Sequence, residues 1–178
     1  MVDKLTIVKL NNKYFLRAGK RLFNCQIGQG GIKKSLKKIE GDKSTPSGKW
    51  NIISIYLRYD KIKRPVIRKK SSFKYHLITK NCAWCDDIYS TVYNKYFNTI
   101  RFSADKVNHE KLWREDDVYD IILVMSYNTK PIIKNKGSAI FLHCSFYDNR
   151  NTLGCIAIKK INLIFLLSYI KKYTYIKI

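Results

Sequence analysis

The chain has 178 residues, a length that suits one domain over residues 1–178 with a proper hydrophobic core. Apolar residues make up 46% of it, which excludes a disordered chain, and the longest apolar run, residues 161–170, is far shorter than the roughly 20 residues that span a bilayer. The net charge of +22 predicts attraction to polyanions, but no aromatic–basic motif or zinc finger is visible, so we expect no nucleic-acid partner and no membrane span.

Short β-type runs open the chain. Residues 5–10, 14–17 and 22–27 predict a β-meander, because turn residues separate them. A glycine-rich loop over residues 28–31 follows, and it does not resemble a phosphate-binding loop, since no helix pattern comes after it in a βαβ unit. Residues 50–56 then predict a further strand.

The middle of the chain, about residues 57–117, is expected to be an insertion that shapes a substrate pocket. Residues 73–78 alternate apolar and polar side chains, as a strand does. Residues 82–117 predict an irregular segment with one short helix over about residues 108–114. The apolar run over residues 118–127 predicts a strong buried strand.

The last third of the chain contains two more apolar strands, over residues 138–143 and 155–158. A buried helix near residues 161–172 and a final strand over residues 174–178 are expected to follow. The pattern as a whole predicts a mainly β fold with small helices and a C-terminal helix.

A histidine and a cysteine stand at the ends of two of these strands. One apolar strand ends on His143, a polar loop over residues 144–151 follows, and the next strand starts on Cys155 after Gly154. A Cys and a His so placed can form a thiolate–imidazole pair, and the glycine permits a sharp turn and a close approach by a substrate. The spacing alone is equally compatible with a buried structural cysteine beside a core histidine.

The other cysteines offer weaker signals. Five cysteines are an odd number, so at least one thiol is unpaired. Cys82 and Cys85 form a C-x-x-C pair, which occurs in redox pairs and as half of a zinc site. A zinc site needs two more ligands and only His76 is near in sequence, while a thioredoxin-like site needs a βαβ pattern that this chain lacks. We therefore interpret Cys82 as structural and expect no metal and no cofactor.

Two motifs carry a family resemblance. His143, a loop and then Thr152-Leu153-Gly154-Cys155 resemble the signature of the L,D-transpeptidase catalytic domain (YkuD type), which is His followed by Ser or Thr, any residue, Gly and the nucleophilic Cys. Residues 40–52 resemble the G-D-x-x-T-P-x-G-x-aromatic-x-I segment from the N-terminal half of that domain. The motifs stand in the family's order, and the resemblance runs from about Lys4 to Ile158.

The resemblance implies a β-sandwich-type catalytic domain that transfers an acyl group from a peptidoglycan stem peptide through a thioester on Cys155. His143 is then the base, its ring oriented by the backbone carbonyl of Cys144, and protonated His143 is expected to lower the pKa of the thiol. Thr152 fills the family's Ser/Thr position and braces the loop. The implied oxyanion donors are the backbone N–H groups of Leu153, Gly154 and Cys155.

Some positions depart from the family pattern. Many members carry Arg two residues after the cysteine, where this chain has Ala157, so we expect Arg150 to hold a substrate carboxylate. Residues 83–87, with residues 93–94 after them, resemble a sub-branch of the family. An acidic pair there is suited to the cationic amine of a diaminopimelate side chain, although a solvated acidic turn explains it equally. The expected pocket residues are Trp84, Asp86, Asp87, Tyr93 and Asn94.

Three functions stay open at this point. In an L,D-transpeptidase the amine of another stem takes up the thioester, whereas in an L,D-carboxypeptidase or amide hydrolase water does so. The third possibility is a non-catalytic basic module that binds nucleic acid or a wall polymer. The expected partner is the peptidoglycan stem peptide, the expected state is a monomer, and the substrate predicts a periplasmic or envelope location, although the N-terminus shows no basic-then-apolar signal peptide.

Overall fold

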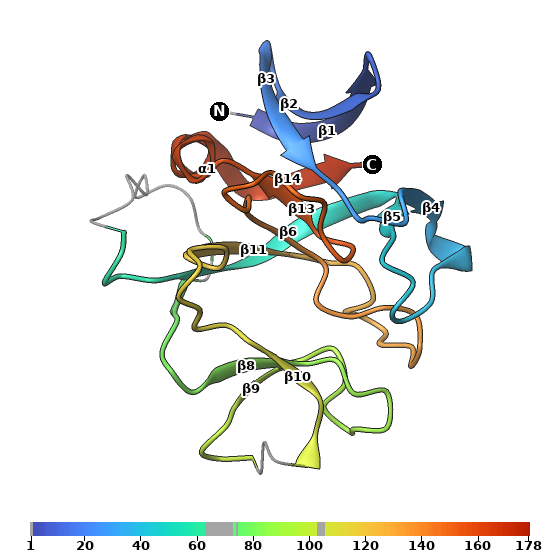
Figure 1. Ribbon diagram of the computed structural model, residues 1–178, viewed down its shortest axis with the longest axis vertical. Helices are drawn as coiled ribbons and strands as arrows, with labels where there is room; N and C mark the ends of the chain where they lie inside the picture. The colour runs from blue at the N-terminus through green and yellow to red at the C-terminus, as the bar shows by residue number, and fades with distance from the viewer. Residues whose placement is uncertain (1, 63–72, 74, 103–105) are drawn as a thin grey trace.

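The computed structural model of the protein describes residues 2–62, 73, 75–102 and 106–178 (Figure 1). Strands dominate the described residues, in which the elements that can be bounded include one α-helix near the C-terminus and a short 3-10 helix. The elements in chain order are β1 (Val2–Leu10), β2 (Lys13–Ala18), β3 (Arg21–Gln26), β4 (Ile32–Lys34), η1 (Ser35–Lys37), β5 (Thr45–Ser47), β6 (Lys49–Leu57), β7 (Tyr75–Leu77), β8 (Cys82–Cys85), β9 (Tyr96–Asn98), β10 (His109–Lys111), β11 (Ile121–Met125), β12 (Phe141–Cys144), β13 (Ile156–Ile158), α1 (Lys160–Leu167) and β14 (Ile170–Lys177).

Most of the strands form one sheet that closes on itself. Its strand order is β11-β12-β13-β3-β2-β1-β14-β6-β7, and β11 also pairs with β6, so that the strands from β11 round to β6 form a ring to which β7 is attached. The meander β1–β2–β3 pairs antiparallel, as the sequence predicts. The prediction of a mainly β fold is confirmed, but the sheet closes through the pairing of β11 with β6 rather than forming two separate sandwich layers.

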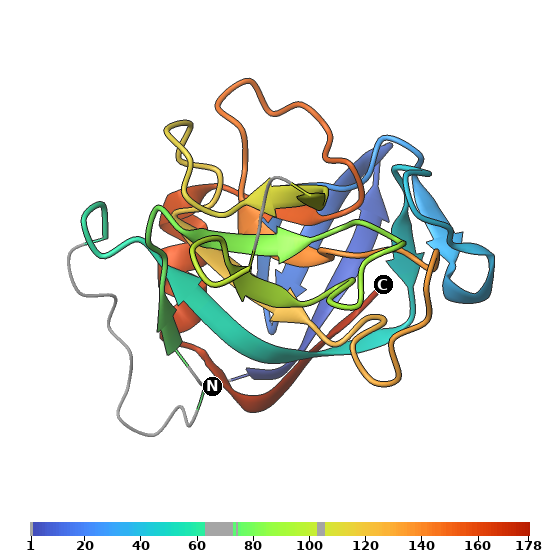
Figure 2. The ribbon, with the colours of Figure 1, turned by 90° about the horizontal axis from the view of Figure 1, so that it is seen from below.

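Alternation along the strands divides the buried side chains between two cores. On β11, Ile121 and Leu123 face the core inside the ring, whereas Ile122 and Val124 face a second core outside it. This second core lies between the ring and a three-stranded sheet of order β10-β8-β9, which is at the bottom of Figure 1 and faces the viewer in Figure 2. Because both faces of β11 are covered, all five of its residues are buried.

The three-stranded sheet corrects the interpretation of residues 82–117. This segment is not wholly irregular, and the predicted helix over residues 108–114 is wrong, because β10 occupies its first half and pairs antiparallel with β8. All four residues of β8 are buried, and the strand bonds to β9 on its other edge. Strand β7 confirms the predicted strand over residues 73–78 at Tyr75–Leu77, while residue 74 lies outside the described residues.

The C-terminal elements differ from the prediction in length. Helix α1 ends at Leu167, well short of residue 172, and β14 begins at Ile170 instead of Thr174. The reason is non-local, since β14 fills the place between β1 and β6 in the ring and buries Thr174 and Ile176 there. Helix α1 buries Leu163, Leu166 and Leu167 in the core inside the ring.

Candidate active site

Parallel pairing brings the two candidate catalytic residues to one face of the ring. Strands β12 and β13 lie side by side in parallel, with His143 opposite Ala157. Since side chains alternate along β12, Leu142 and Cys144 enter the core inside the ring, and His143 shares the outer face with Phe141. Cys155, just before β13, belongs to that same outer core.

A cleft of about 810 Å³ opens at this face, and both Cys155 and His143 line it. One wall comes from the loop before β5, including Glu40 and Lys43. The opposite wall comes from β10 and the residues that follow it, and the loop between β12 and β13 closes the rim. The residues of this wall that line the cleft are His109, Glu110, Lys111, Arg114, Val118 and Tyr119.

The thiol of Cys155 is held by the backbone on the floor of the cleft. Sγ donates to the carbonyl oxygen of Ala139 at 3.0 Å and accepts from the N–H of Phe141 at 3.4 Å. The residue is only 8% exposed, and burial raises the pKa of the thiol well above its ordinary value. The nucleophile candidate is therefore a neutral thiol in the resting protein.

The imidazole of His143 is fixed on two sides. Nδ1 lies 2.8 Å from the carbonyl oxygen of Cys144, and because a carbonyl can only accept, Nδ1 carries the proton and Nε2 keeps its lone pair. The edge-on ring of Tyr119, 5.2 Å away between centroids, sets the plane of the imidazole. Burial lowers the pKa of His143 to about 4, against the weaker opposing effect of the Cys144 bond.

These pKa shifts correct one expectation. The sequence interpretation has protonated His143 lowering the pKa of the Cys155 thiol, but at neutral pH the buried imidazole is uncharged and the pKa of the thiol is raised. Both residues are therefore neutral at rest, and the thiol of Cys155 donates its hydrogen bond to the carbonyl oxygen of Ala139. Burial thus favours the neutral thiol over the thiolate at this position.

The turn before the cysteine is braced from within. Thr152 Oγ1 accepts from the N–H of Gly154 at 3.2 Å and donates to the carbonyl of Cys155 at 2.6 Å. Gly154 has φ of +139°, a conformation that L side chains rarely adopt. Among the hydrogen bonds of the described residues, the N–H groups of Leu153 and Cys155 donate none. These two N–H groups thus have no hydrogen-bond partner among the described residues, whereas that of Gly154 is engaged.

A second brace reaches the turn from β5. Thr45 is fully buried, and its Oγ1 accepts from the N–H of Gly28 at 2.8 Å and donates to the carbonyl of Gly154 at 2.9 Å. The backbones of Gly28 and Gly154 also approach each other closely, because a Cβ added at Gly28 would lie 3.0 Å from the Cα of Gly154. The threonine of the T-P-x-G motif therefore ties the residue before the nucleophile to the β5 segment.

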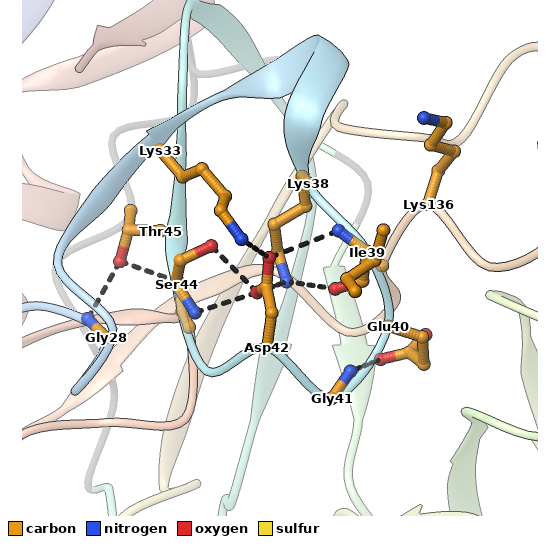
Figure 3. Close-up of polar contacts among 12 residues, drawn as sticks. Gly28, Lys33, Lys38, Ile39, Glu40, Gly41, Asp42, Ser44, Thr45 and Lys136 are labelled. Atoms are coloured by element: carbon orange, nitrogen blue, oxygen red, sulfur yellow. Dashed lines mark hydrogen bonds and ion pairs between the residues drawn. The ribbon is translucent and has the colours of Figure 1, made fainter.

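Asp42, from the same motif, anchors the loop that carries the cleft wall (Figure 3). Its carboxylate accepts from Lys33 at 3.0 Å, from Lys38 at 2.6 Å, and from both the N–H and the hydroxyl of Ser44 at 2.9 and 2.7 Å. Burial by itself raises the pKa of Asp42, but the bonds from Lys38 and Ser44 outweigh it and hold that pKa well below its ordinary value. Asp42 does not line the cleft, so its contacts hold the loop in place.

Three carboxylates gather in the cleft of a strongly basic protein. Glu40 accepts from the Tyr93 hydroxyl at 2.5 Å and from the Ser138 hydroxyl at 2.7 Å, and Glu110 accepts from Tyr119. Asp86 differs, because its buried Oδ1 has no hydrogen-bond partner within the described residues. Burial raises the pKa of both Asp86 and Glu110. An entering cation would find partly uncompensated acceptors here.

The expected pocket residues divide into two groups. Asp86, Arg150, Thr152 and Leu153 line the cleft. The rest support its floor or lie behind its wall, without lining it: Trp84, Asp87, Tyr93 and Asn94.

Asn94 shows what the supporting residues do. Its Oδ1 accepts from the indole N–H of Trp84 at 2.9 Å and from the N–H of Ala139 at 3.1 Å. Ala139, with φ of 51°, is the residue whose carbonyl holds the thiol of Cys155. Trp84 and Asn94 therefore connect to Cys155 through the backbone of Ala139, without lining the cleft.

The sequence interpretation missed Tyr119 and Glu110. Tyr119 was included only as part of a buried strand, and it lies just before β11, where its ring meets His143. Glu110 was placed in a predicted helix, although β10 directs it into the cleft. Neither residue belongs to a motif: Glu110 is placed by the pairing of β10 with β8, and Tyr119 by its position just before β11.

Cys82 and Cys85 do not form a shared site. Because they are three residues apart on one strand, they face opposite sides of β8, and they belong to different buried clusters. All five cysteines are free and buried. The interpretation of Cys82 as structural agrees with its burial and with its contact to the N–H of Thr79 at 3.2 Å.

Comparison with known protein families gives the class that this fold and cleft define. The L,D-transpeptidase catalytic domain family (YkuD) matches residues 3–178, essentially the whole chain, and the chain belongs to that family. Comparison with curated proteins found no match. Among the described residues, no helix has the length and apolar character needed to cross a membrane.

Proposed function

We propose that this protein is a cysteine-dependent L,D-transpeptidase that acts on peptidoglycan stem peptides through a thioester on Cys155. The observation that carries the proposal is that one cleft contains both the thiol of Cys155 and the oriented imidazole of His143. Family membership supplies the substrate class, since the family acts on peptidoglycan. Such a substrate puts the site of action in the cell envelope.

Acylation starts from the neutral pair. The thiol turns from the carbonyl of Ala139 toward Nε2 of His143, which takes the proton as Sγ attacks the carbonyl carbon of the L,D-peptide bond. The oxyanion that forms receives the free N–H groups of Leu153 and Cys155, each worth very roughly 3 kcal/mol. His143 then gives its proton to the departing amine of the terminal D-residue, and the thioester remains.

The second half reverses the proton path. The neutral amine of another stem attacks the thioester carbonyl, His143 accepts a proton from that amine, and the proton returns to the Cys155 sulfur as it leaves. Water can take the place of the amine, which makes the protein an L,D-carboxypeptidase. No metal and no cofactor enters either half, since each bond made and broken is balanced by one proton on His143.

Carboxylates in the cleft lining, which also carries Lys43, Lys111, Arg114 and Arg150, offer a place for a cationic side chain of the substrate. Asp86 and Glu110 face the cleft, and the unpartnered oxygen of Asp86 suits the amine of a diamino acid in the stem. Arg150 lies on the rim, with its guanidinium carbon 4.0 Å from the ring centroid of Phe146. Its Nη1 is 3.9 Å from Oδ2 of Asp148, which is longer than a hydrogen bond. It remains our choice for a substrate carboxylate.

The test is turnover of a purified tetrapeptide stem, with mass detection of released D-alanine and of the cross-linked dimer. Cys155→Ala should abolish both products, and a trapped acyl-enzyme should add the mass of the tripeptide to the wild type only. Cys85→Ala removes an equally buried thiol outside the cleft and is the matched control. D-alanine without dimer would assign water as acceptor, and turnover that survives Cys155→Ala would end the proposal.

A further inference from the structure

A second groove, of about 420 Å³, adjoins the active-site cleft, and no step of the proposed reaction uses it. Its lining is rich in carboxamide side chains, with the half-buried ring of Tyr14 beside them. None of the described residues that line it is acidic, and Lys13 is its only cation. The carboxamides are Asn12, Asn24, Gln26, Gln29, Asn149 and Asn151.

One of these amides is left without a partner. Gln26 ends β3, is 7% exposed, and its Oε1 is buried with no hydrogen-bond donor among the described residues. A buried polar atom in this state costs free energy, and a donor that enters the groove satisfies it once the Gln26 side chain turns toward the groove. Gln26 lies near the candidate catalytic cysteine, because it pairs in register with Ala157, two residues after Cys155.

The groove and the cleft share a wall. The N–H of Thr152 donates to the carbonyl of Ile27 and the N–H of Gln29 donates to the carbonyl of Thr152, both at 2.9 Å. Gln29 and Asn151 line both spaces. Thr152 precedes Cys155 by three residues, which limits their Cα separation to about 11 Å. A ligand with its carbonyl at the thiol can therefore extend over this wall.

We propose that the groove binds the neutral N-acetylated sugar portion of the peptidoglycan strand while its stem peptide occupies the cleft, an inference that rests on the proposed function. Three stem residues separate the scissile carbonyl from the sugar, a reach of about 10–11 Å when extended, which matches the wall. Carboxamides both donate and accept, as sugar hydroxyl and acetamido groups require. The cleft lining carries both carboxylates and Lys or Arg side chains, whereas the described groove lining has no carboxylate, so the charged part of the substrate is placed in the cleft and the uncharged part in the groove.

The kinetic test compares a free tetrapeptide stem with the same stem on its disaccharide. The wild type should show a KM about tenfold lower for the disaccharide-bearing substrate, equivalent to one or two net hydrogen bonds. Asn24→Ala, an exposed position that the fold tolerates, and Gln26→Leu should bring the ratio of the two KM values close to one. Asn162→Ala, on α1 and outside both spaces, should keep the wild-type ratio.

A binding measurement separates this inference from the proposed function. Cys155→Ala is titrated with the tetramer of N-acetylglucosamine, and calorimetry should detect binding that Asn24→Ala removes. Turnover with equal KM values and no binding of the tetramer would overturn the proposal that the groove binds sugar, and it would leave the proposed transpeptidase activity standing. Binding of the tetramer that depends on Asn24, without turnover of either substrate, would uphold the groove and overturn the enzyme.

Discussion

Replacement of Thr45 by Val tests whether the brace between β5 and the catalytic turn holds the nucleophile. The change keeps the shape of a fully buried side chain and removes one hydroxyl, so the N–H of Gly28 and the carbonyl of Gly154 both lose their partner. Each buried group left unpaired costs about 1–3 kcal/mol, so unfolding should become easier by about 2–6 kcal/mol. Thr45→Ser keeps the hydroxyl and loses one methyl, which costs about 1 kcal/mol.

Urea unfolding followed by far-UV circular dichroism measures the two free energies of unfolding. Turnover per folded molecule is the second readout, because the freed carbonyl of Gly154 allows the turn to shift, and a displacement of about 1 Å at a reacting group can cost about a hundredfold in rate. Thr45→Ser should stay within a few-fold of wild type. Equal unfolding midpoints for the Val and Ser variants would refute the reasoning, since the hydroxyl would then carry none of the stability.

Three further predictions follow from the site. Because the pKa of His143 falls from 6.5 to about 4 on folding, the free energy of unfolding should decrease as the pH drops from 6.5 toward 4, by up to about 3 kcal/mol. His143→Gln should remove this contribution when urea unfolding is compared at pH 7 and pH 4.5. Alkylation of Cys155 by iodoacetamide, counted by difference from Cys155→Ala, should keep rising beyond pH 9, whereas a plateau at neutral pH would indicate a preformed thiolate. Asp42→Asn leaves Lys38 buried without its charge partner and should lower the free energy of unfolding by about 3–5 kcal/mol in the same assay. Asp3→Asn, whose pair with Lys171 is exposed, is the control and should lower it by under about 1 kcal/mol.

The parts of the fold that local pattern determines are predictable from the sequence. Strands β1, β2, β3 and β6 lie where alternation and turn residues indicate them. The pairing of β11 with β6, which closes the ring, joins segments far apart in the chain and leaves no local trace. Strands β8, β9 and β10 have only three or four residues each, and their strand character comes from pairing with one another, so propensity alone misses them.

The candidate site divides along the same line. Cys155 and His143 stand in a compact motif, and glycine and threonine beside the cysteine have local structural reasons that a single sequence can reveal. Tyr119 and Glu110 reach the site through tertiary pairing and carry no signature. The ionisation of the pair was also beyond the sequence, because it depends on how completely the fold excludes water from His143.

A neutral pair is a reasonable resting state for a nucleophile in so buried a position. An ion pair at this site would need two charges taken out of water, a cost that their attraction often fails to repay. The neutral thiol avoids that cost, and its hydrogen bond to Ala139 keeps it in a form that oxidants attack slowly, since the thiolate is the reactive species. In the mechanism that we propose, charge develops only when a substrate carbonyl lies between the sulfur and the N–H groups of Leu153 and Cys155. The same burial that raises the pKa of the thiol therefore makes its activation depend on substrate.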